Sequence, residues 1–183
     1  MGDASAAVGD LCFDFENMPV RLIATKKIQR METSGIVVEE TEPNRELTAN
    51  LWIAWELVES GLARFADGGL AGEEWTQIHY RERLLPVGQP SPLPDGFYPR
   101  AYLTFNRMSR EAGSDATRTV NLNRIRGMFR DILESRISKI ARLASAEAAS
   151  PSREFQPEEA ALYAALKEAV SSWRGELRRL EGR

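Results

Sequence analysis

An uninterrupted apolar stripe in residues 122–144 constrains the fold more than any other feature of the sequence. Its side chains recur at steps of three and four residues, the spacing that places them on one side of an α-helix. The stripe consists of Ile125, Met128, Phe129, Ile132, Leu133, Ile137, Ile140 and Ala144. A helix over this range extends about 35 Å, as long as a small domain is wide. Other elements must therefore cover it along its whole length.

A second apolar stripe follows Pro157, where a proline and two acidic residues mark the start of a helix. It comprises Leu162, Leu166, Ala169, Trp173, Leu177 and Leu180. Alternating steps of four and three are typical of helices that pack side by side, with axes about 20° apart. Such regular heptads often contact another subunit as well as their own chain. The candidate core or subunit-interface residues are Ile125, Phe129, Ile132, Ile140, Leu166, Trp173 and Leu177.

The part of the chain before the long helices has a different character. Residues 1–10 are small and polar, which predicts a flexible start. Residues 11–66 contain three short β-rich segments, LCFDF, VRLIA and GIVVEE, followed by an apolar helix at 51–62. We therefore expect a small β-rich domain with one helix in this range.

A glycine-rich segment at 67–74 predicts a linker. The spacing of its glycines fits neither a P-loop nor a dinucleotide-binding loop. Residues 75–183 predict a helical domain, with helices at 73–85, 97–112 and 122–144 and a last one from 157 onward. We expect Asp95 to cap the second of these helices and Thr119 or Asn121 to cap the third. The predicted fold class is α+β, mostly α, with a small β-rich N-terminal domain followed by a helical-bundle domain.

Composition restricts the setting in which the chain works. Hydrophobic residues make up 43% of the 183 residues, enough for a real core. The single cysteine, Cys12, cannot form an internal disulfide and is interpreted as a small apolar core residue in a reducing, intracellular protein. We find no targeting leader and no apolar run of the roughly 18 residues that a membrane span needs. The expectation is a soluble, intracellular protein.

Few residues suggest catalysis. Asp14 and Glu16 would share one face of a strand, where paired carboxylates could hold Mg²⁺ for a hydrolase. A solvated strand face is the simpler interpretation, because no third acid is marked. The one histidine, His79, cannot build a zinc site with a single cysteine, and no nucleophile-elbow motif accompanies it. We predict no enzyme activity, no metal site and no cofactor.

Basic side chains are concentrated between Arg100 and Arg142, with 10 basic residues against 4 acidic ones. Six of them lie on the long helix: Arg124, Arg126, Arg130, Arg136, Lys139 and Arg142. They could bind phosphates, so a helical DNA-binding protein is the alternative function. Because Asp131 and Glu134 interrupt them, a solvated, ion-paired helix surface is the simpler interpretation.

Three segments, taken in order, resemble the GINS family. LTANLWIAWEL at 47–57 is similar to the helix that closes the small domain of GINS subunits, although the proline of that motif is absent here. LPDGFYPRAYLTF at 93–105 resembles the family's entry into a helix of the bundle. RIRGMFRDILESRISKIARLA at 124–144 is similar to its long helix, with Arg126, Asp131, Arg136 and Lys139 at the matching polar positions.

The resemblance implies a non-catalytic scaffold subunit in DNA replication. A small β-rich domain before the helical domain is the order of the Psf-two/Psf-three branch and of the related archaeal subunit. The implied partners are a sister GINS subunit in a 2:2 heterotetramer, the MCM helicase, and a RecJ-like or Cdc-type protein. DNA contact is secondary, and no membrane contact is expected. The resemblance implies a location in the cytoplasm of an archaeon or in the nucleus of a eukaryote.

Overall fold

The computed structural model describes residues 11–33, 35–86, 88–113, 115–146 and 155–180. Backbone contacts divide these residues into two compact units, one within 11–69 and the other from residue 70 onward. The first contains short strands and two helices, and the second contains four longer helices. The fold is mostly α with a small β region, as the sequence predicted.

The first unit is built on a three-stranded antiparallel sheet of β1 (Pro19–Ala24), β4 (Glu46–Asn50) and β5 (Ala63–Phe65), in the order β4-β1-β5. Alternate residues of the central strand, Val20, Leu22 and Ala24, are buried, since successive side chains point to opposite faces. Leu22 pairs with Leu47 on one side and with Phe65 on the other. The strand VRLIA is therefore confirmed, and it is the middle of the sheet.

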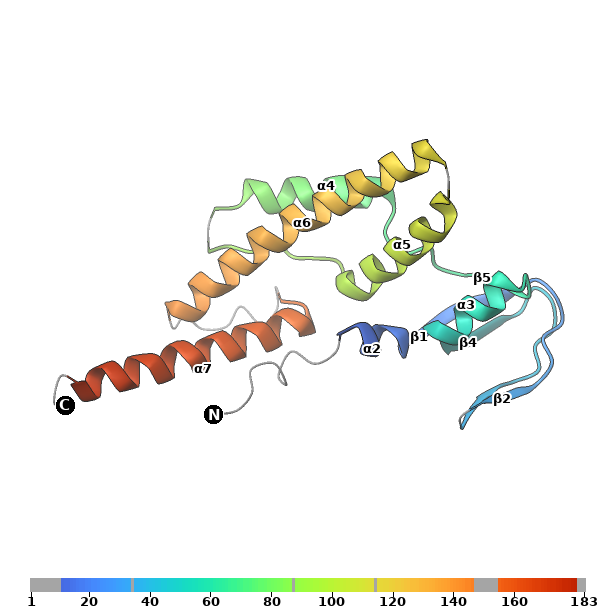
Figure 1. Ribbon diagram of the computed structural model, residues 1–183, viewed down its shortest axis with the longest axis horizontal. Helices are drawn as coiled ribbons and strands as arrows, with labels where there is room; N and C mark the ends of the chain where they lie inside the picture. The colour runs from blue at the N-terminus through green and yellow to red at the C-terminus, as the bar shows by residue number, and fades with distance from the viewer. Residues whose placement is uncertain (1–10, 34, 87, 114, 147–154, 181–183) are drawn as a thin grey trace. The chain divides into compact units, whose positions relative to one another are not determined.

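Helix α3 (Leu51–Glu59) packs against all three strands of this sheet (Figure 1). It buries most of its apolar side chains, and the Trp55 ring meets the Phe65 ring edge-on at a centroid distance of 4.6 Å. Strands β2 (Met31–Thr33) and β3 (Ile36–Val38) form a separate hairpin. Of the segment GIVVEE, only Ile36–Val38 form a strand.

The segment LCFDF is not a strand. Residues Leu11–Glu16 form the short helix α2, which contacts α3. Both sides of β1 are paired, with β4 and β5, so a further strand at this point could not pair with β1. Cys12 is exposed on α2, and its interpretation as a core residue is wrong.

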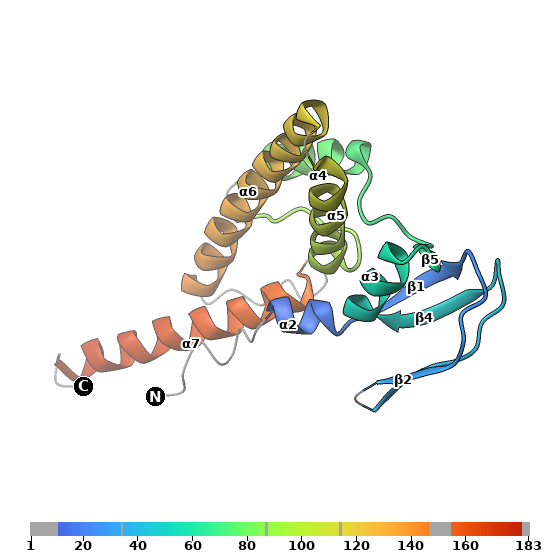
Figure 2. The same ribbon diagram turned by 45° about the vertical axis from the view of Figure 1, so that its right-hand side comes forward.

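The second unit is organised around α6 (Ala116–Ser145), which packs against α4 (Gly72–Leu84), α5 (Phe97–Ala112) and α7 (Pro157–Leu180) (Figures 1 and 2). The bounds of α5 are those predicted. Helix α4 begins inside the segment predicted as linker, and the buried Leu70 just before it already belongs to the core of this unit. Most of the apolar stripe of α6 is therefore covered by helices of its own chain, whereas Ile137 remains 44% exposed.

The caps differ from those predicted. Asp115 caps α6, accepting hydrogen bonds from the backbone N–H groups of Thr117 at 2.8 Å and Arg118 at 3.2 Å. Thr119 and Asn121 lie inside the helix. Gly96, in a left-handed conformation with φ of 63°, takes the N-cap position of α5 instead of Asp95.

Two apolar clusters hold the helices together. In the first, the Trp75 ring of α4 contacts Phe97 and Phe105 of α5 and Phe129 of α6, at centroid distances between 5.6 and 5.9 Å. In the second, Ile140 and Ala144 of α6 pack with Phe155 and Tyr163, the latter on α7. None of the helices in the described ranges has a stretch long and apolar enough to cross a lipid bilayer.

Candidate functional site

Four charged side chains lie buried where α4, α6 and α7 meet. They are Glu82 of α4, Arg136 and Lys139 of α6, and Glu159 of α7, each with a side chain no more than 4% exposed. We call these four residues the charge cluster. Its two positive and two negative charges balance, and this balance is what allows ions to be buried away from water.

Glu159 binds Arg136 through two parallel hydrogen bonds. The Nε of Arg136 donates to Oε1 at 2.7 Å, and Nη2 donates to Oε2 at 2.6 Å. This bidentate geometry matches the planar guanidinium to the carboxylate and restricts their relative orientation. The Tyr98 hydroxyl of α5 donates a third bond to Oε1 at 2.7 Å.

Glu82 is held from the other side of the cluster. Lys139 Nζ lies 2.8 Å from its Oε1, and Arg136 Nη1 lies 3.3 Å from its Oε2. Ser91 donates to Oε2 from both its backbone N–H at 3.0 Å and its hydroxyl at 2.7 Å, while Ser135 donates to Oε1 at 3.0 Å. The backbone carbonyl of Ser91 in turn accepts a bond from Arg136. Polar bonds therefore join all four helices and the 91–94 segment.

These contacts shift protonation equilibria. Burial alone would raise the pKa of the Glu82 carboxyl, but hydrogen bonds from Lys139 and Ser91 and the Arg136 charge outweigh it, so this pKa lies below the ordinary value. Burial and the adjacent Glu159 carboxylate raise the pKa of the Tyr98 hydroxyl. Burial would lower the pKa of Arg136, but the bonds to Glu159 raise it. All three groups therefore keep their ordinary charge states near neutral pH.

The charge cluster corrects the interpretation of the basic helix surface. Arg136 and Lys139 were expected on the helix surface, either solvated and ion-paired or bound to phosphates, but both are buried. Arg126 lies on the exposed side, 3.0 Å from the Ser109 hydroxyl, and Arg124 reaches the Thr76 hydroxyl at 3.5 Å. The row of six basic residues is therefore divided between the interior and the surface.

The residues considered for catalysis do not come together. Asp14 and Glu16 lie on helix α2, where side chains two positions apart do not face each other. His79 Nε2 is 3.0 Å from Asp131 Oδ2 in a contact between α4 and α6. Across the described ranges, no group of three or more His, Cys, Asp or Glu side chains is placed to hold a metal ion. The shared strand face expected for the two acids is thus wrong.

Helix α7 uses its apolar stripe in two different ways. Leu162 and Leu166, in the first half, pack partly buried against the Ile140 cluster of α6. In the second half, Trp173 is 66% exposed, Leu177 42% and Leu180 83%. We call these last three residues the distal stripe. Its side chains continue the apolar face with which α7 packs on α6. Because this part of the face is exposed, another partner can pack against it.

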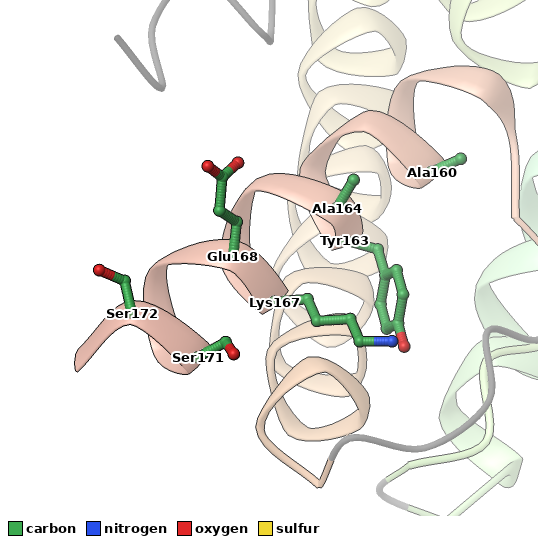
Figure 3. Close-up of a pocket in the computed structure, with 7 residues that line it drawn as sticks. All are labelled: Ala160, Tyr163, Ala164, Lys167, Glu168, Ser171 and Ser172. Carbon is green, nitrogen blue, oxygen red and sulfur yellow. The ribbon is translucent and has the colours of Figure 1, made fainter. Parts of the chain in front are cut away.

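A shallow hollow runs along another side of α7 (Figure 3). It is lined by Ala160, Tyr163, Ala164, Lys167, Glu168, Ser171 and Ser172. The Lys167 ammonium lies 5.8 Å from the centre of the Tyr163 ring. Among the described residues, all the lining side chains come from this one helix.

The sequence-derived candidates divide between core and surface. Ile125, Ile132 and Ile140 are buried, and Phe129 and Leu166 are partly buried against the two apolar clusters. Sequence reasoning missed Glu82, Ser91, Tyr98, Gln156 and Glu159. Glu159 carried a signal, since it is the third residue of α7, a position that favours an acid. Glu82 carried no such signal in the sequence, because an acid in a polar helix normally faces solvent.

Residues 73–178 match the family described as the GINS complex protein helical bundle domain. This range is more than half of the chain and contains two of the three segments that resemble GINS subunits, those at 93–105 and 124–144. The third, at 47–57, lies outside it. A comparison with curated proteins returned no match.

Proposed function

The chain belongs to the GINS family, and on this premise we propose that it is a non-catalytic scaffold subunit that works by assembly with other GINS subunits in DNA replication. The fold supports a scaffold role because its buried polar side chains join the helices to one another. Arg136 binds residues from α4, α7 and the 91–94 segment of its own chain. Such contacts fix the shape of a bundle.

The observation that carries the proposal is the distal stripe of α7. Trp173, Leu177 and Leu180 are large apolar side chains on the solvent side of a well-formed helix. A helix of a sister GINS subunit is the occupant we assign to it, because the exposed half continues the same seam along which α7 packs on α6. Helix-on-helix packing of this kind buries the row of side chains that water otherwise contacts.

We further propose the Psf-two/Psf-three branch, in its archaeal form, as the place of this chain in the family. The order of its parts supports this proposal, since the β-rich unit precedes the helical unit. In this form two copies of the chain would join two copies of the sister subunit. The tetramer would bridge the MCM helicase and a RecJ-like or Cdc-type protein.

We propose that residues 11–66 form a domain of their own, followed by a linker that begins at residue 67 and by the helical domain. The predicted linker at 67–74 is shortened at its end, because Leu70 is buried in the helical core and α4 begins at Gly72. The buried side chains of the sheet and of α3 support this division, because they give the N-terminal unit an apolar core. Its small size limits the surface it can bury, so docking on a partner would add stability.

Co-expression with a sister GINS subunit tests the proposed function. We expect the two chains to co-purify and to elute as one species whose mass, measured by light scattering, equals two copies of each. The chain alone should be poorly soluble or self-associated. A monodisperse monomer that ignores the sister subunit would overturn the proposal.

A further inference from the structure

Helix α7 is anchored at its beginning, and its far half projects the distal stripe. In the first turns, Glu159 and Tyr163 are buried, and Leu162 and Leu166 pack against α6. In the far half, directly beside Trp173, Arg174 donates an exposed hydrogen bond from Nη2 to the Ser145 carbonyl at 2.6 Å, close to the C-terminal end of α6. The direction of a rigid helix is set where it is held. The buried contacts of the first turns, together with this exposed bond, therefore decide where Trp173 and its neighbours lie.

The beginning of α7 and its docking depend on the same carboxylate. Glu159 is the third residue of the helix, and its Oε2 accepts a hydrogen bond from the backbone N–H of Gln156 at 3.0 Å. This bond is the acid half of a capping box, which stabilises a helix start. The same carboxylate forms the bidentate pair with Arg136. Formation of the α7 start and its attachment to α6 are thus coupled through one side chain.

Gln156 extends this coupling to α5. The N-cap of α5 is Gly96, which has no side chain to offer as an acceptor. The Gln156 Oε1 accepts from the first backbone N–H of that helix, at Phe97, over 3.3 Å, while its Nε2 donates to the Leu93 carbonyl at 3.5 Å. The residue before α7 therefore satisfies a backbone group at the start of α5.

We infer that Glu159 is a positioning residue for subunit assembly: acting through Arg136, it sets the direction in which α7 presents the distal stripe. This inference rests on the proposed function for its biological meaning, although the anchoring can be measured without a partner. The paired geometry supports it, since two parallel hydrogen bonds hold an orientation as well as a contact. Apolar packing alone is less directional.

Hydrogen exchange of the full chain, purified alone, tests the anchor. In Glu159→Gln, which keeps the shape of the side chain and removes its charge, we expect α7 amides to exchange about tenfold faster or more, with a smaller change in α4 and α5. Tyr98→Phe removes one bond to the carboxylate and should act in the same direction more weakly. Glu176→Gln, on the exposed far part of α7, is the matched control.

Unchanged exchange of α7 in both test variants would overturn the inference. So would an equal acceleration in all four helices, because Glu159 would then be an ordinary stabilising residue. If the anchor effect is present but the unmodified chain binds no sister GINS subunit, the proposed function fails while the anchor stands.

A double variant separates positioning from stability. Arg136→Met with Glu159→Met removes both charges together, and the remaining Glu82 and Lys139 still balance. We expect thermal stability to recover relative to Glu159→Gln, whereas affinity for the co-expressed sister subunit stays about tenfold or more below that of the unmodified chain. Recovery of affinity together with stability would overturn the positioning role.

Discussion

Arg136 and Glu159 form a two-bond ion pair at 2.7 and 2.6 Å, and both side chains are at least 98% buried. The pair joins the long central helix to the helix that bears the distal stripe. A buried ion pair contributes little net stability compared with apolar residues of the same shape, because both ions lose their hydration. Its importance is geometric, because two parallel hydrogen bonds restrict the angle at which the two helices meet.

Arg136→Met is expected to destabilise the chain by about 3–5 kcal/mol, because it leaves a buried carboxylate without its partner. Arg136→Lys retains the charge but not the planar fork, so we expect a smaller loss of about 2 kcal/mol. Urea denaturation at neutral pH measures both. Equal stability of the lysine variant and the unmodified chain would show that the charge alone matters and the fork does not.

Acid should destabilise the helical unit through Glu82. Its pKa in the folded chain lies below the ordinary value, so protons bind more tightly to the unfolded chain. The contribution of Glu82 to the free energy of unfolding is therefore complete above its pKa in the unfolded chain, about 4.3. This contribution is lost as the pH falls through its pKa in the folded chain. Denaturation curves from pH 7 to pH 3 measure this slope.

Glu82→Gln provides the comparison for the acid effect. It should lower stability at pH 7 by about 3–5 kcal/mol, since Lys139 and Arg136 lose a buried partner, and it should flatten the slope below pH 5. Glu176→Gln, which affects a solvent-exposed pair with Arg179, should change neither by a comparable amount. If the stability of Glu82→Gln still decreases below about pH 5 as steeply as that of the unmodified chain, other carboxylates cause the acid destabilisation.

The observed cap of α6 predicts a difference between two neighbouring substitutions. Asp115→Ala removes the acceptor for two backbone N–H groups and should cost about 1 kcal/mol. Asn121→Ala, at a position that the sequence suggested as a cap, should cause no loss, because alanine is the better helix former inside a helix. Thermal melts of the two variants compare them directly, and a larger loss for Asn121→Ala would contradict the cap assignment.

Phe129→Ala should cost about 3 kcal/mol, near the lower end for buried aromatic residues because the ring is partly exposed. The ring packs between Trp75, Phe97 and Phe105, so its removal opens a hole in the first apolar cluster. Phe129→Leu fills part of that hole and should lose less. If both variants lose the same free energy, the aromatic contacts rather than the volume determine stability at this site.

Local periodicity predicted the helices but not their polar starts. The bounds of α5 and the start of α7 at Pro157 were visible because apolar spacing and a proline mark them. Helix α6 begins before its stripe does, in a polar segment where Val120 is itself exposed, so only the Asp115 cap reveals the start. Strands β4 and β5 are short and depend on pairing with β1, a tertiary contact that no local pattern contains.

The charge cluster was half visible in the sequence. Arg136 and Lys139 were singled out as polar positions of a family motif, but their environment could not be read from the helix to which they belong. Being three residues apart, they share a face, and whether that face meets water or carboxylates is decided by α4 and α7. The alternation of LCFDF misled for a related reason, since a short alternating segment becomes a strand only when a sheet edge is free beside it.

Trp173→Ala separates the assembly surface from the core. Because this side chain is 66% exposed, its removal should change the stability of the isolated chain by no more than about 0.5 kcal/mol. If the distal stripe contacts a sister GINS subunit, a buried tryptophan at that contact contributes about 2 kcal/mol or more, so affinity should fall by roughly thirtyfold.

Tyr80→Ala is the matched control, since Tyr80 is a 63% exposed aromatic residue on α4. Sedimentation with the sister subunit, beside thermal melts of each variant alone, measures the two effects. Equal affinity of the Trp173 and Tyr80 variants would remove the distal stripe as the contact, whereas a large stability loss in Trp173→Ala alone would place this residue in the fold of its own chain.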